Sequence, residues 1–116
     1  MGDDDLPVFV HWEQTLGEIL DRTGRFPKSV RFTLAERIDV LALEVLEHLV
    51  EARYSRSKAA ALTRAGLAIE KIRLLCRVAH DRGHLDHRGY EVLSRRLVEA
   101  GAMVGGWRRS RREREA

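Results

Sequence analysis

The sequence has one cysteine, two prolines and no long apolar run. The single cysteine, Cys76, excludes a disulfide within the chain. Without about 20 consecutive apolar residues, no segment is suited to span a membrane. The acidic start, MGDDD, lacks the positive charge of a secretory signal peptide. We therefore expect a protein that acts in the cytoplasm and does not bind a membrane.

Strand patterns and catalytic motifs are also missing. No segment alternates apolar and polar residues over the length of a strand, and no internal repeat is visible. The chain has no glycine-rich phosphate loop and no G-x-S-x-G nucleophile motif. These absences favour an all-α protein that is not an enzyme and uses no cofactor.

The histidines leave two chemical alternatives open. His80, His84 and His87 have the spacing H-x3-H-x2-H and could bind zinc, although Gly83 interrupts the helix between them. Cys76 and His80 are four residues apart and could meet on one helix face as a nucleophile and its base. Apolar residues surround Cys76 in the helical pattern, so we expect a buried structural cysteine. The three histidines do not share a helical face and a polar turn explains them as well, so we expect no metal site.

The residues that are abundant favour long helices. Charged residues make up 34% of the chain and hydrophobic residues 44%, and 116 residues suit one domain with a real core. Apolar residues recur at three- and four-residue spacing in four segments, at about 6–22, 33–54, 57–82 and 87–106. Short connections between them predict an antiparallel up-down-up-down four-helix bundle over residues 1–107.

Local signals mark the expected helix ends. Asp5 is placed to cap the first helix and Gly24 to end it. The segment TLAE, which begins at Thr33, predicts a capping box for the second helix. Gly83 is expected to end the third helix, and Asp86 to cap the fourth. The link before Thr33 is apolar enough that Phe26, Val30 and Phe32 should be covered.

The last residues of the chain are expected to form two segments, a glycine-rich helix end and a basic tail. Gly105 and Gly106 predict the end of the fourth helix, and Trp107 is expected to close the bundle with its indole N–H near water. Residues 108–116 are expected to form a basic, disordered tail.

A second apolar stripe on the third helix predicts a subunit interface. Leu67, Leu74 and Val78 lie roughly opposite the expected core stripe, where a monomer would leave them in water. The second helix has a smaller extra pair, Leu43 and Val50, beside an acidic strip that could face basic residues of a neighbouring subunit. We expect a homo-oligomer.

The basic residues predict a polyanionic partner. The sequence pI is about 9.5, which favours binding to RNA or DNA, and no base-reading motif suggests sequence preference. The plainer alternative is that these residues only keep the surface soluble. The candidates lie in the first link, at the turn between the second and third helices, and in the tail: Arg25, Lys28, Arg31, Arg53, Arg56, Lys58, Arg108, Arg109, Arg111 and Arg112.

Four placed motifs resemble one family. They are FPKSVRFTLAERI, EARYSRSKAAAL, IEKIRLLCRVAHD and GYEVLSRRLVEAGAMVGGW. Over about residues 20–108 the chain resembles the accessory variability determinant (Avd) proteins of diversity-generating retroelements. These are related to four-helix-bundle proteins encoded in ribosomal-RNA intervening sequences. An arginine often precedes the methionine of the last motif in that family, and here the position is Ala102.

The resemblance implies a bundle that assembles into a ring-like homopentamer and binds nucleic acid through its basic surface. It also implies association with a reverse transcriptase that copies a template RNA with adenine-directed errors, in which the accessory protein is not the polymerase. A protein-interaction scaffold that does not bind nucleic acid directly is the alternative.

Overall fold

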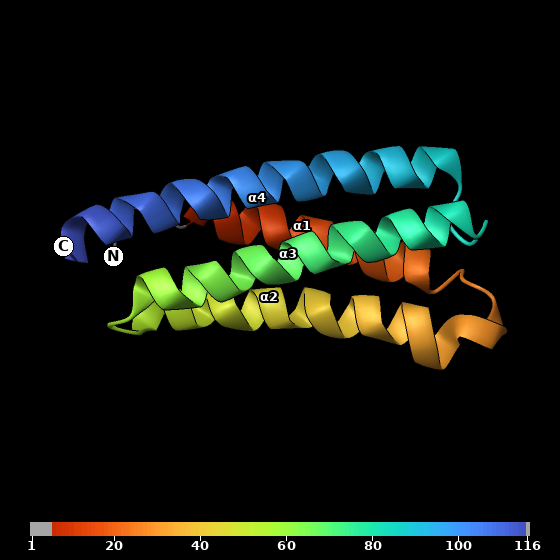
Figure 1. Cartoon of the computed structure of the whole chain (residues 1–116), viewed down its shortest axis with the longest axis horizontal. Helices are drawn as coiled ribbons and strands as arrows, with labels where there is room; N and C mark the ends of the chain where they lie inside the picture. Colours follow the sequence, from red (N-terminus) through yellow and green to blue (C-terminus); the bar gives the residue numbers. More distant parts are fainter. Residues whose placement is uncertain (1–5, 116) are drawn as a thin grey trace.

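The computed structural model of the chain is an assembly of four long helices, shown in Figure 1. It describes the backbone of residues 6–115 and the side chains of residues 6–111. The helices are α1 (Leu6–Thr23), α2 (Glu36–Tyr54), α3 (Lys58–Asp81) and α4 (His87–Glu115), with a 3-10 turn, Lys28–Val30, and a π turn, Arg31–Ala35, before α2. The described residues contain no strand, so the all-α four-helix prediction is confirmed. The expected cap, Asp5, lies outside the described residues.

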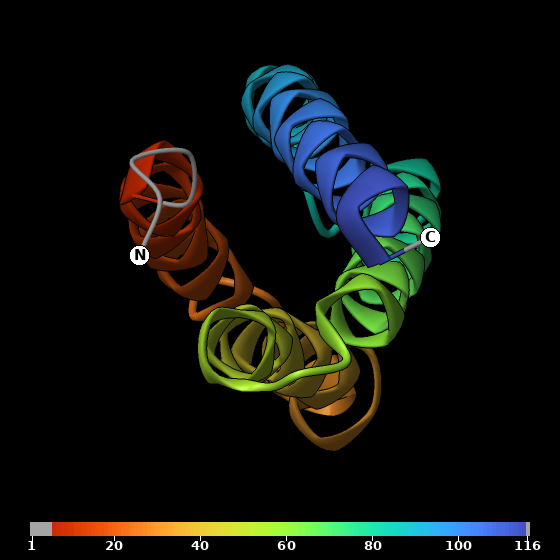
Figure 2. The same cartoon turned by 90° about the vertical axis from the view of Figure 1, so that its left-hand side faces the viewer.

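The helices lie side by side along an axis of 46 Å. The turn between α2 and α3 lies at the same end as the C-terminus of α4, and the other two connections lie at the opposite end (Figure 1). Each helix packs on the next, and α1 also contacts α4, so the four surround one core (Figure 2). None of the described helices is long and apolar enough to cross a membrane.

The core is built from one stripe of each helix. The expected stripes of α2, α3 and α4 are buried, apart from their half-buried ends at Leu34 and Tyr90. On α1 the buried stripe is Val8, Trp12, Thr15, Ile19 and Thr23, whereas Leu20 is 41% exposed. The indole of Trp12 donates a hydrogen bond to the Ala42 carbonyl oxygen at 3.0 Å, which ties α1 to α2.

Three of the expected helix ends are confirmed. The amide of Gly24 donates to the Leu20 carbonyl just beyond α1, and Gly83 has a positive φ of 79° after α3. The Asp86 carboxylate accepts a hydrogen bond from the Gly89 amide at 2.7 Å, as an N-cap side chain does.

The expected capping box at Thr33 is wrong. Thr33 lies inside the π turn and its hydroxyl donates back to the Val30 carbonyl at 3.4 Å, so α2 begins only at Glu36. Helical backbone starts earlier, at Lys28, which removes the extended residue that a capping box needs. Phe26 is buried as expected, but Phe32 is 76% exposed and is not covered by the described residues.

The expected end of α4 at Gly105 and Gly106 is also wrong. α4 continues through both glycines to Glu115, because buried Val104 and Trp107 hold this stretch on the core. We expected the indole N–H of Trp107 to lie near water. It is buried instead, and it has no hydrogen-bond acceptor among the described residues. The division into a bundle, 1–107, and a separate tail, 108–116, stays a prediction.

A polar cluster joins α1 to α4. The Arg96 guanidinium donates to the Thr15 hydroxyl at 3.1 Å and to the His11 carbonyl at 3.2 Å. Burial lowers the pKa of the His11 imidazole below its usual 6.5, and the positive charge of Arg96 adds to this, while Glu99 opposes it.

We expect this cluster to make stability fall in mild acid. The folded pKa of His11 lies below the unfolded value, so the stabilising neutral form is fully present above about pH 6.5 and is lost as pH falls through the folded pKa. Urea unfolding at pH 7.5 and 5.5 should give a smaller loss of free energy for His11→Gln than for wild type. His87→Gln, which replaces an exposed imidazole, is the control. An equal loss in wild type and His11→Gln would contradict this assignment.

Cys76 should react slowly with thiol reagents in the folded protein. It is 1% exposed, as expected, and burial raises the pKa of its thiol to about 12. Labelling at neutral pH should be fast only after unfolding in denaturant. Cys76→Ala should cost about 1 kcal/mol of stability through lost buried volume. Fast labelling of the native protein would contradict burial.

Candidate nucleic-acid interface

The structure separates the candidate basic residues into two groups at opposite ends of the bundle (Figure 1). The residues of the first link lie where α1 joins α2. The residues of the α2–α3 turn lie at the other end, with those at the C-terminal end of α4. The Arg112 side chain lies outside the described residues. A ligand that contacts both groups must follow the length of the bundle.

The link end is held by Phe26. Its ring is buried with its centroid 6.2 Å from that of the His84 ring, so the link folds back against the turn between α3 and α4. This leaves Arg25, Lys28 and Arg31 exposed around a fixed anchor.

Sequence reasoning missed two arginines at this end. Arg37 from α2 and Arg82 after α3 are both exposed and line a hollow of about 440 Å³ with an apolar floor that includes Leu75. Exposed Phe32 lies in the same π turn that contributes Thr33 to this hollow. No local pattern brings these residues together, because they come from three segments that are separate in the sequence.

At the opposite end, Lys58 is engaged within the fold. Its ammonium group donates to the carbonyls of Ala52 and Arg53 at 2.9 and 2.8 Å, which satisfies two acceptors at the end of α2. The Arg53 guanidinium carbon lies 5.7 Å from the centroid of the exposed Tyr54 ring. Arg56 is exposed in the turn. Lys58 therefore has a structural role, while Arg53 and Arg56 border an exposed aromatic surface.

The arginines that end α4 lie on more than one face of the helix. Arg109 is exposed, and its guanidinium lies over Gly105, where an added Cβ would be 3.4 Å from one of its nitrogens. Arg108 and Arg111 are half-buried, and the Nε atom of Arg111 has no hydrogen-bond partner among the described residues. The helix thus presents arginine in several directions at this end.

The alternative chemical sites find little geometric support. Cys76 is buried, and the His80 ring stacks on Tyr90 with centroids 4.5 Å apart. His80 and His87 have ring centroids 5.7 Å apart, whereas His84 lies against Phe26. Within residues 6–111, no group of three histidine, cysteine or acidic side chains is placed to hold a metal ion.

The expected interface residues are exposed in the single chain. Leu67 is 57% exposed, Leu74 54% and Val78 39%. Each lines a different hollow on the outer surface of α3, so the stripe is not one flat patch.

Comparison with known protein families gives a match over most of the chain. The model of the bAvd-like family matches residues 10–111. No curated protein matches the chain. The matched segment includes part or all of each of the four helices and every candidate basic residue except Arg112, and it agrees with the resemblance to accessory variability determinant proteins. The chain therefore belongs to the bAvd-like family.

Proposed function

We propose that this protein is a non-enzymatic, nucleic-acid-binding accessory protein that associates with a retroelement reverse transcriptase in the cytoplasm and supports mutagenic copying of template RNA. Membership of the bAvd-like family supports the accessory role. The observation that carries nucleic-acid binding is the exposure of arginine at both ends of the bundle, where a planar guanidinium can grip phosphate oxygens through two N–H groups.

The proposed assembly is a ring-like homopentamer of antiparallel up-down-up-down bundles. The exposure of Leu67, Leu74 and Val78 supports a contact between subunits on the outer face of α3. A ring would repeat each basic patch, so that weak phosphate contacts add through effective concentration.

A scaffold that binds only proteins is the second candidate. It is favoured by the engagement of Lys58 within the fold and by the apolar side chains exposed on α2 and α3. In that case the remaining arginines would contact an acidic protein partner.

Replacing Arg108, Arg109 and Arg111 with glutamine should weaken binding to RNA and DNA of any sequence. The salt dependence of the binding constant should flatten by about one unit per lost phosphate contact. The matched control replaces Lys71, Arg77 and Arg95, which lie along α3 and α4 between the two ends, with glutamine. A salt titration of fluorescently labelled oligonucleotides measures both variants.

Replacing Arg25, Lys28 and Arg31 at the link end with glutamine shows how much each of the two basic groups contributes to binding. If wild-type protein shifts neither RNA nor DNA at low salt, nucleic-acid binding fails and the scaffold takes its place.

Leu74→Glu, alone or with Leu67→Glu, should reduce the mass of the particle in solution. Burying three such side chains contributes about 1.5–3 kcal/mol each before the cost of association, and a buried carboxylate reverses that gain. Light scattering measures the mass, and Leu20→Glu on the exposed face of α1 is the control. An unchanged mass in the double variant would show that the contact lies elsewhere.

A further inference from the structure

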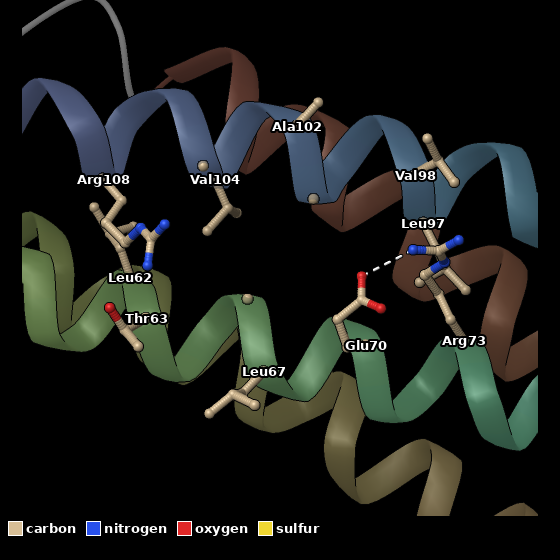
Figure 3. Close-up of a pocket in the computed structure, with 13 residues that line it drawn as sticks. Leu62, Thr63, Leu67, Glu70, Arg73, Leu97, Val98, Ala102, Val104 and Arg108 are labelled. Atoms are coloured by element: carbon tan, nitrogen blue, oxygen red, sulfur yellow. Dashed lines mark hydrogen bonds and ion pairs between the residues drawn. The ribbon is translucent and has the colours of Figure 1, made fainter.

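A groove of about 430 Å³ lies between α3 and α4 (Figure 3). Gly66 of α3 and Gly101 of α4 help to form it. Val98, which is 50% exposed, lines it together with Leu67. In Figure 3, Arg108 lies toward one end of the groove, and at the other end Leu97 and Val98 lie above Arg73.

The protomer itself does not need glycine at the two positions in this groove. A Cβ atom at Gly66 would meet nothing within 4 Å, and at Gly101 it would lie 3.9 Å from the nearest atom, in Ile69. Neither glycine has a positive φ. Each one weakens its helix relative to alanine. The small residues keep the groove open to a molecule that could enter it.

Helix α2 carries an exposed apolar face, which projects from the surface, whereas the groove is hollow. Val40, Leu43 and Val50 are 39%, 45% and 44% exposed and share one helix face, away from the buried stripe of α2. Glu36 and Glu47 are exposed on the same face. This apolar stripe with its two carboxylates is called the α2 stripe below.

The groove and the α2 stripe agree in length. At 1.5 Å per helical residue, the groove extends about 15 Å along α4 from Val98 to Arg108. The apolar part of the α2 stripe, from Val40 to Val50, also spans about 15 Å.

Their charges are opposite in sign. Guanidinium groups lie toward both ends of the groove, from Arg73 and Arg108, and the two carboxylates of the α2 stripe are about 16 Å apart along the helix. In the protomer Arg73 pairs with Glu70 at 2.8 Å, but both side chains are exposed. An exposed pair of this kind contributes little, so Arg73 remains available to another carboxylate.

We propose that the α3–α4 groove of one copy receives the α2 stripe of a second copy. This rests on the proposed homo-oligomer and specifies one part of its contact, in which Leu67 takes part, whereas Leu74 and Val78 lie outside the groove. The groove and the stripe are different surfaces, so the interface is heterologous, and repetition of it either closes a ring or extends a filament.

Two substitutions test the two sides of the interface separately. Gly101→Leu fills the groove, and Leu43→Glu places a charge in the exposed α2 stripe. Gly17→Leu is the matched control, because Gly17 is a helical glycine on α1 with nothing within 4 Å of an added Cβ. Light scattering should give monomers for the first two variants and the wild-type mass for the control. Helicity and thermal unfolding check the fold, and if Gly101→Leu does not fold, Gly66→Leu takes its place.

Mixing the two variants identifies the occupant. Gly101→Leu retains an intact α2 stripe and Leu43→Glu retains an intact groove, so an equal mixture should form dimers and nothing larger. A mixture that stays monomeric, or variants that keep the wild-type mass alone, would overturn the proposal. If wild-type protein is itself monomeric, the proposed homo-oligomer fails together with this contact. Nucleic-acid binding is measured separately and is not decided by either result.

Discussion

Each helix of this bundle must bury one apolar stripe. How the four helices meet this requirement determines which side chains remain exposed on the surface. Helices α2 and α3 pack on each other most extensively, and α3 buries three alanines, Ala61, Ala65 and Ala68. Small side chains at such positions let two helices approach closely. A bundle of four helices has a single core, so apolar residues on the outer faces of α2 and α3 have no partner within it. The proposed contact between copies would cover part of this exposed apolar surface.

Two basic side chains form hydrogen bonds within the bundle, outside its apolar core. Between α1 and α4, the Arg96 guanidinium donates to the Thr15 hydroxyl and to the His11 carbonyl. At the end of α2, the ammonium group of Lys58 satisfies two helix carbonyls. Both side chains are basic, and both are used by the fold. A high pI therefore does not by itself identify the residues available to a polyanion, and the exposed arginines at the bundle ends are the ones that remain.

The sequence predicted the helices better than their ends. The stripes of α2, α3 and α4 and the burial of Cys76 follow from three- and four-residue spacing, which one helical turn determines locally. The box at Thr33 and the glycines at 105–106 were misread for a shared reason. Both are local signals that the surrounding structure overrides. At Thr33 the backbone is already helical from Lys28 onward, and at the glycines the buried side chains of Val104 and Trp107 keep α4 on the core.

The sequence by itself determined that the chain has four helices, which face of α2, α3 and α4 is buried, and which family the chain belongs to, because these depend on residue order within a turn or a motif. Only the tertiary structure decided that Arg37 and Arg82 meet at one hollow, that the basic candidates divide between two ends, and that Gly66 and Gly101 open one groove. Such neighbours lie on different helices. Their meeting depends on the register and separation of whole helices, which many packed side chains set together and no local pattern records.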